Sequence, residues 1–287
     1  MFRELPILEH RGAYQKLYVI EIRNIDCNHW PIGEYIEQVL LVTPKSEKLT
    51  AKFLHYPQTS ELMIFNVTLD DAKRSHYFCG KTQCQNMYSV QLDQPLCIVQ
   101  FKPYAWYAFG RLPVERYQGR MLKLPCSTRA EPFDPEALPD YLQHRFQREK
   151  SYEPAYRMMP EIVDYIDTHL NTVNVNQLGR TFRLSEATLR RYFKKFIGLN
   201  VSDYIRYRKV REMTLRLYRG DYNALAVQEC GFYDQSHFIR EFRRIHDTTP
   251  TQFIGELRRV FTEDSNAERL FNACYVKLEG EAEEPKP

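Results

Sequence analysis

The chain has 287 residues, 43% of them hydrophobic and 27% charged, so it is long enough for two domains and has the composition of an ordinary globular protein. Its net charge of +3 is unevenly distributed, because residues 157–260 contain 18 Lys and Arg against 12 Asp and Glu. A basic region indicates a nucleic acid or another acidic partner. The seven cysteines include no C-x-x-C pair, which argues against a disulfide framework and against a zinc site.

The beginning of the chain shows no targeting pattern. Glu4, Glu9 and His10 stand where a signal peptide would need an apolar stretch. No apolar run reaches the length that spans a bilayer. We therefore expect a protein of the reducing cytoplasm that has no membrane partner.

The part of the chain from Lys16 to about Gly110 has the pattern of β-strands. Short runs rich in β-branched and aromatic residues alternate with turn residues, at 16–23, 35–44, 48–57, 60–69, 75–82 and 89–101. No helix-length pattern alternates with them, which favours an antiparallel sandwich or a small cupin-like barrel over a βαβ fold. Residues 1–125 are thus expected to form a β-rich domain.

An aromatic segment at residues 104–109 has two interpretations. Together with Trp30, Tyr56, Phe65 and Phe101 it lines an apolar cavity for a small molecule, or these rings form the core of the β domain, which is the commoner case. Effector-binding residues stay unknown at this level. The scattered histidines lack metal-ligand spacing, and motifs for nucleophilic, acid–base or phosphate chemistry are absent. We predict no metal, no cofactor and no enzymatic activity.

The segment after the β pattern reads as a linker. Four prolines lie between residues 122 and 139 and interrupt regular structure. Residues 140–151 then place Tyr141, Leu142 and Phe146 among charges, which predicts a short amphipathic helix. Its apolar stripe packs either on the N-terminal domain or against the same helix of a second subunit.

The basic part of the chain contains an internal repeat, in which residues 184–198 align with 233–247 at an offset of 49. The matched pairs are Leu189 with Phe238, Phe193 with Phe242, Phe196 with Ile245, Arg191 with Arg240, Lys194 with Arg243 and Lys195 with Arg244. Each copy begins with an N-cap residue, Ser185 or Asp234, and continues with apolar residues at helical spacing. Each copy is therefore predicted to be a short helix with one buried stripe.

The outer face of each predicted helix is small at its N-terminal end and cationic further on. In the DNA major groove a small residue allows close approach, an arginine forks onto guanine and flanking cations neutralise phosphates. The alternative is a pair of solvated amphipathic helices, but the same face in two copies favours DNA. The predicted DNA-binding residues are Ala187, Arg190, Arg191, Lys194 and Lys195 in the first copy and Gln235, Ser236, His237, Arg240, Arg243 and Arg244 in the second.

Further helices are predicted around the two copies, at residues 158–170, from Asn174 or Asn176 to Phe182, and at 201–219, 223–230 and 251–260. Helix, tight turn and helix with a polar outer face is the helix-turn-helix plan, which the pattern predicts twice. The connecting helix of some 19 residues would be roughly 28 Å long at 1.5 Å per residue. With its turns it would hold the two outer helices about one DNA turn apart.

One motif in the second copy is specific to a family. The pattern G-F-x-D-Q-S-x-F-x-R-x-F-[KR]-[KR], followed by T-P, is matched from Gly231 to Pro250. Over roughly residues 157–258 the chain resembles the DNA-binding domain of the AraC/XylS family of bacterial transcription regulators. It departs from the family at Asn200-Val201, in place of Ser-Pro, and at Ala226-Val227, in place of Ile-Ala.

The resemblance implies an α+β protein with a C-terminal double helix-turn-helix domain that binds double-stranded DNA in a sequence-specific way and regulates transcription, with activator as the expected role. RNA polymerase, a small effector and a second copy of the chain are further candidate partners. The predicted divisions are residues 1–125 for sensing or dimerisation, 126–156 as a linker, 157–260 for DNA binding and 261–287 as a tail whose end is disordered.

Two other classes of function compete with this interpretation. A cupin-type small-molecule enzyme with an appended DNA-binding module would contain a bound metal. An alkylation-repair regulator would hold zinc through a cysteine cluster, and the spacing of the cysteines does not provide one. The effector, the operator, the oligomeric state and the distinction from a repressor stay open.

Overall fold

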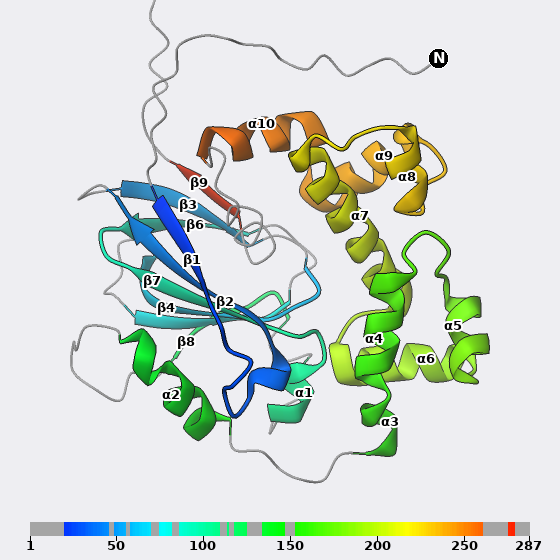
Figure 1. Ribbon diagram of the computed structural model, residues 1–287, viewed down its shortest axis with the longest axis horizontal. Helices are drawn as coiled ribbons and strands as arrows, with labels where there is room; N and C mark the ends of the chain where they lie inside the picture. Colours follow the sequence, from blue (N-terminus) through cyan, green and yellow to red (C-terminus); the bar gives the residue numbers. More distant parts are fainter. Residues whose placement is uncertain are drawn as a thin grey trace, which may run out of the picture.

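The computed structural model describes residues 20–45, 49–55, 58–69, 75–81, 86–109, 114, 118–124, 134–146, 153–260 and 275–278 (Figure 1). An antiparallel sheet in the N-terminal part is followed by a helical region, which confirms the predicted order. The strands are β1 (Ile20–Ile25), β2 (Ile36–Pro44), β3 (Leu49–His55), β4 (Leu62–Leu69), β5 (Ser75–Cys79), β6 (Asn86–Leu92), β7 (Leu96–Phe101), β8 (Met121–Lys123) and β9 (Tyr275–Leu278).

The sheet has the order β1-β2-β7-β4-β6-β3-β9, with β5 paired to β4 and β8 paired to β5. The predicted closed barrel is not confirmed, because the path of the described strands is open, with β1 and β9 at its ends. Strand β9 was not predicted. It lies in the expected tail and pairs with β3 in the register that places Lys277 opposite Lys52. The rest of the tail lies outside the described residues.

A bulge in β4 changes the partners of this strand. Before the bulge β4 pairs with β7 and β5. After it Val67 still pairs with Ser75 of β5, while Thr68 and Leu69 pair with β6 in place of β7. The turning point is Asn66, whose φ of 62° is in the left-handed region that asparagine tolerates. Its backbone N–H donates to Nδ1 of His76 at 3.0 Å, and burial lowers the pKa of His76, so the ring stays neutral and accepts.

The helices are α1 (Ala105–Phe109), α2 (Leu138–Arg145), α3 (Pro154–Arg157), α4 (Met159–Thr168), α5 (Val175–Phe182), α6 (Glu186–Tyr192), α7 (Val201–Arg219), α8 (Ala224–Glu229), α9 (Gln235–His246) and α10 (Pro250–Val260). The π-helical turn η4 (Phe193–Ile197) continues α6, and the 3₁₀ turns η1 (Gly33–Tyr35) and η3 (Pro135–Ala137) lie in the N-terminal half. Helix α7 has the 19 residues expected and runs between the pairs α5–α6 and α8–α9 (Figure 1). Within the described ranges, no helix is both long and apolar enough to cross a membrane.

Two apolar clusters contain side chains from both halves of the chain. In one cluster, Leu40 and Ile64 of the sheet are grouped with Met213 of α7. In the other, Val39 of the sheet is grouped with Phe193 of η4. Because successive residues of a strand point to opposite faces, both faces of the sheet contribute to the core.

The aromatic segment belongs to the core, as the second interpretation expected. Trp106 stacks on Phe78 at a centroid distance of 4.1 Å. Trp30, Phe65 and Phe101 are buried, whereas the side chain of Tyr56 lies outside the described residues.

The structure also decides how the linker helix packs. Leu142 of α2 is fully buried, and Tyr141 meets the ring of Phe65 edge-on at 5.5 Å. The apolar stripe of α2 therefore packs on the sheet of its own chain. The helix begins at Leu138 rather than at residue 140, since Pro139 is tolerated in a first helical turn.

Candidate DNA-binding surface

The first helix pair is formed by α5 and α6. Asn174 caps α5, because its side chain accepts a hydrogen bond from the N–H of Gln177 at 2.9 Å. The helix ends at Phe182, and the next residue, Arg183, caps it with a left-handed φ of 54°. Ser185 then caps α6 by accepting from the N–H of Thr188 at 3.1 Å. Two successive caps in the local sequence therefore produce a tight turn between the two helices.

The outer face of α6 and η4 is exposed and cationic. Ala187, Arg190, Arg191, Lys194 and Lys195 are all exposed, as predicted, while Leu189 and Phe193 are fully buried on the opposite side. Arg190 forms an i,i+4 ion pair with Glu186 at 3.3 Å, with side chains 66% and 44% exposed. Such a surface pair is weak, so it leaves Arg190 available to a stronger anion.

The second pair repeats this arrangement in α8 and α9. Asn223 caps α8, and Asp234 caps α9 by accepting from the N–H of His237 at 2.7 Å. Phe238 and Phe242 of α9 are fully buried. Four of the predicted residues are exposed, namely Ser236, Arg240, Arg243 and Arg244, and two are half-buried, namely Gln235 and His237.

His237 has a local role that the sequence did not reveal. Its Nδ1 accepts the backbone N–H of Tyr233 at 3.4 Å, and its ring lies edge-on to Phe232 at 5.5 Å. The imidazole therefore supports the turn before α9. The side chain of Tyr233 is left 87% exposed beside the basic face, a position that no periodicity signalled.

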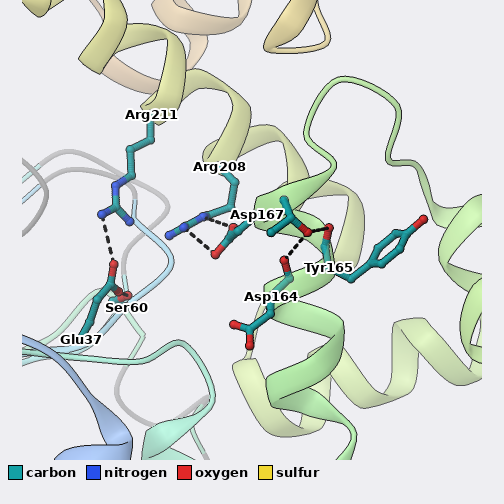
Figure 2. A network of polar contacts seen from close by, with 8 residues as sticks. Glu37, Ser60, Asp164, Tyr165, Asp167, Arg208 and Arg211 are labelled. Carbon is teal, nitrogen blue, oxygen red and sulfur yellow. Dashed lines mark hydrogen bonds and ion pairs between the residues drawn. The ribbon is translucent and has the colours of Figure 1, made fainter. Parts of the chain in front are cut away.

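Ion pairs join α7 to other elements of the protein, and Figure 2 shows those of Arg208 and Arg211. Arg208 binds Asp167 of α4 with two hydrogen bonds, Nε to Oδ1 at 2.6 Å and Nη2 to Oδ2 at 2.7 Å. This planar fork allows little rotation. Arg206, in the same stretch of α7, binds Glu241 of α9 at 3.0 Å. The connecting helix is therefore bonded to α4 and to α9, which bears the second basic face.

The same helix is bonded to the sheet. Arg211 donates to Glu37 of β2 at 3.1 Å, and Glu37 also accepts from the hydroxyl of Ser60 at 3.3 Å (Figure 2). Burial alone would raise the pKa of Glu37, but the charges of Arg211 and Arg208 outweigh it, so the pKa is below its ordinary value. Sequence analysis missed these residues, since no short-range pattern connects positions so far apart.

Metal-ligating side chains are not clustered in the part of the chain that the structure describes. Within the described ranges, no three or more His, Cys, Asp or Glu side chains form a group that could hold a metal ion. The free cysteines in these ranges, Cys27, Cys79, Cys97 and Cys230, are buried.

The helical region is similar in sequence to a known domain family. Residues 178–256 match the model of a helix-turn-helix domain family. The probable transcription factor PqrA of Proteus vulgaris is 27% identical over 103 residues, which cover 34% of this chain and 84% of that protein. The F1 operon positive regulatory protein of Yersinia pestis is 30% identical over 95 residues, and the chain spans about a third of its length, 32%.

Among solved structures, ToxT from Vibrio cholerae aligns over 83% of this chain and 98% of its own, with a TM-score of 0.41 and 10% identity. The family match extends from within α5 to within α10. Residues 178–256 therefore form an AraC-type helix-turn-helix domain of the kind found in DNA-binding transcription regulators, which confirms the resemblance drawn from the motif.

Proposed function

We propose that the chain is a sequence-specific transcription regulator in which both helix pairs act as helix-turn-helix motifs. One observation carries this proposal: the same exposed face, small and then cationic, occurs on α6 and on α9. Helix α7 has 19 residues and is therefore roughly 28 Å long, and with its turns this length suits two successive major-groove segments on one side of the duplex. A single chain would then read its operator without a palindrome.

The side chains on these faces have different proposed roles. Arg191 and Arg240 read guanine, because an arginine fork matches the two acceptors of that base. Ala187 and Ser236 are small and allow the helices to approach the groove closely, and Gln235 helps Arg240 to read the bases. Phosphate neutralisation is assigned to the remaining cations, Arg190, Lys194, Lys195, Arg243 and Arg244, while His237 holds the turn from which α9 enters.

For the rest of the chain we propose the division inferred from the sequence, with residues 1–125 sensing an effector or dimerising and residues 126–156 as the linker. RNA polymerase is a proposed partner, and activation is the proposed sign, since a relative of the helical region is a positive regulatory protein by its name.

The test uses duplexes selected from a random DNA pool by the purified protein. Arg191→Ala should relax the preference at one segment, and Arg240→Ala at another about ten base pairs away, each at a cost of about 1–3 kcal/mol for the preferred base. Lys194→Ala is the control, because loss of a phosphate contact weakens all sequences alike. The two-segment assignment is wrong if both arginine variants alter the same base pairs or if Arg240→Ala alters none.

A further inference from the structure

The far end of the first basic helix lies against the N-terminal half. Helix α6 and η4 end at Gly198, whose φ is 84°. A Cβ at this position would lie 2.7 Å from Cγ1 of Val114, so only glycine allows the two segments to approach so closely. The side-chain amide of Gln118 donates a hydrogen bond to the carbonyl of Gly198. The end of η4 is therefore held by residues that precede the linker.

Lys195 is bound at this contact. Its Nζ lies 2.5 Å from Oε1 of Glu153, the residue before α3. Tyr107 of α1 donates its hydroxyl to the same oxygen at 3.1 Å, and Nζ of Lys195 lies 6.0 Å from the centre of the Tyr107 ring. The Tyr107 ring in turn meets Phe196 edge-on at 4.7 Å. One ammonium group is therefore held by a carboxylate and by a ring from outside the helix.

The two copies of the repeat differ here, although their sequences are equivalent. Arg244, which corresponds to Lys195, has no ion-pair partner among the residues that the structure describes. The hydrogen bond from Lys195 lowers the pKa of Glu153, so this carboxylate is ionised at neutral pH. A charged carboxylate and a DNA phosphate would bind the same ammonium group.

We propose that Glu153 withholds Lys195 from the DNA backbone, so that the chain in this arrangement makes one phosphate contact fewer through α6 than its sequence provides. This inference rests on the proposed function of α6. The pair is weak enough to be reversible, since Lys195 and Glu153 are 44% and 50% exposed. Because Tyr107 donates to the same carboxylate, a movement of the N-terminal half that carries Tyr107 away would remove one of the contacts that hold Glu153 beside Lys195.

The test measures binding of the full chain to a labelled duplex of arbitrary sequence, by fluorescence anisotropy, between about 50 and 200 mM salt. Glu153→Gln should make the slope of log K against log salt steeper by about 0.9, the value of one additional phosphate contact. Affinity at low salt should rise about two- to five-fold, the range that an exposed ion pair accounts for. Glu161→Gln is the matched control, because it removes the charge of a second exposed glutamate, which lies on α4 rather than beside Lys195.

Lys195→Ala, made alone and together with Glu153→Gln, completes a double-mutant cycle. It should leave the salt slope of the wild-type chain unchanged and abolish the gain in the Glu153→Gln background. The inference is overturned if Glu153→Gln behaves like Glu161→Gln, or if Lys195→Ala reduces the slope equally in both backgrounds. A flat salt response of the wild-type chain would instead contradict DNA binding itself, so the two failures are distinguishable.

Discussion

Single residues of the same type have different environments in this protein. Lys195 and Arg244 are equivalent in the repeat, yet only Lys195 is paired with a described carboxylate. His237 supports an exposed turn, while His246, nine residues later on the same helix, is 6% exposed. Environment rather than residue type therefore decides which side chains are available to a ligand.

His246 should make the helical region sensitive to acid. Its ring stacks on Phe242 at 4.3 Å and lies 4.8 Å from Phe253, and burial lowers its pKa from 6.5 to about 3. In the unfolded chain the ring binds a proton near pH 6.5, so protonation favours unfolding between these values. Stability is present above about pH 6.5 and is lost as the pH falls toward 3, at up to about 1.4 kcal/mol per unit.

The free energy of unfolding in urea should therefore fall between about pH 7 and pH 5, and His246 should account for about 2 kcal/mol of this fall. In His246→Phe, which keeps an aromatic ring between its neighbours, the fall should be smaller by this amount. Other groups titrate in both proteins alike, so the difference between the two is the measured quantity. An identical pH dependence would show that folding does not lower the pKa of His246.

At the scale of an element, α7 is the part that relates the two basic faces. Its apolar residues Val210 and Met213 are buried, and its arginines reach α4, α9 and the sheet. Arg216 adds an ion pair to Glu229 of α8 at 2.5 Å. The orientation of α7 thus depends on ion pairs with α4, α8, α9 and the sheet rather than on its own helix propensity.

Removal of the fork on Asp167 should be costly. Arg208 is 16% exposed and Asp167 30%, so Arg208→Ala leaves a half-buried carboxylate unpaired and should lower the free energy of unfolding by roughly 1–3 kcal/mol. Arg208→Lys should lose less, because one charged hydrogen bond of the two can persist. Arg190→Ala is the control, since its exposed pair with Glu186 is worth under about 1 kcal/mol. Equal losses in chemical denaturation for Arg208→Ala and Arg190→Ala would refute this ranking.

At the scale of the whole molecule, the two halves are in contact through apolar and charged groups. The ring of Tyr156 in α3 lies 5.2 Å from Tyr107 and 5.6 Å from Phe196, and its hydroxyl donates to the carbonyl of Tyr104. Arg211 and Glu37 form a second contact.

A fragment from Ala155 to Val260 should nevertheless fold and bind DNA. Its helices bury their own stripes, including Leu178, Leu189 and Phe238, which are fully buried. Circular dichroism should show a helical, cooperatively unfolding protein. Because the fragment lacks Glu153, its salt slope should resemble that of the Glu153→Gln chain rather than that of the wild type. A fragment without helical structure would contradict the proposed division.

Local features of this protein were determined by the sequence alone. The caps at Ser185 and Asp234, the buried stripes of α6 and α9 and the length of α7 depend on residues within a few positions of one another, where side-chain periodicity and capping act directly. For the same reason the family motif, which is contiguous, identified the helical region.

Long-range relations were decided only by the tertiary structure. The pairing of β9 with β3, the open path of the sheet and the contact of Arg211 with Glu37 bring together residues that are far apart in the chain, and no local spacing encodes such a meeting. Lys195 shows the consequence for function: its helix face was predictable from periodicity, but its partner Glu153 was not, because the two residues are 42 positions apart and no local spacing brings them together.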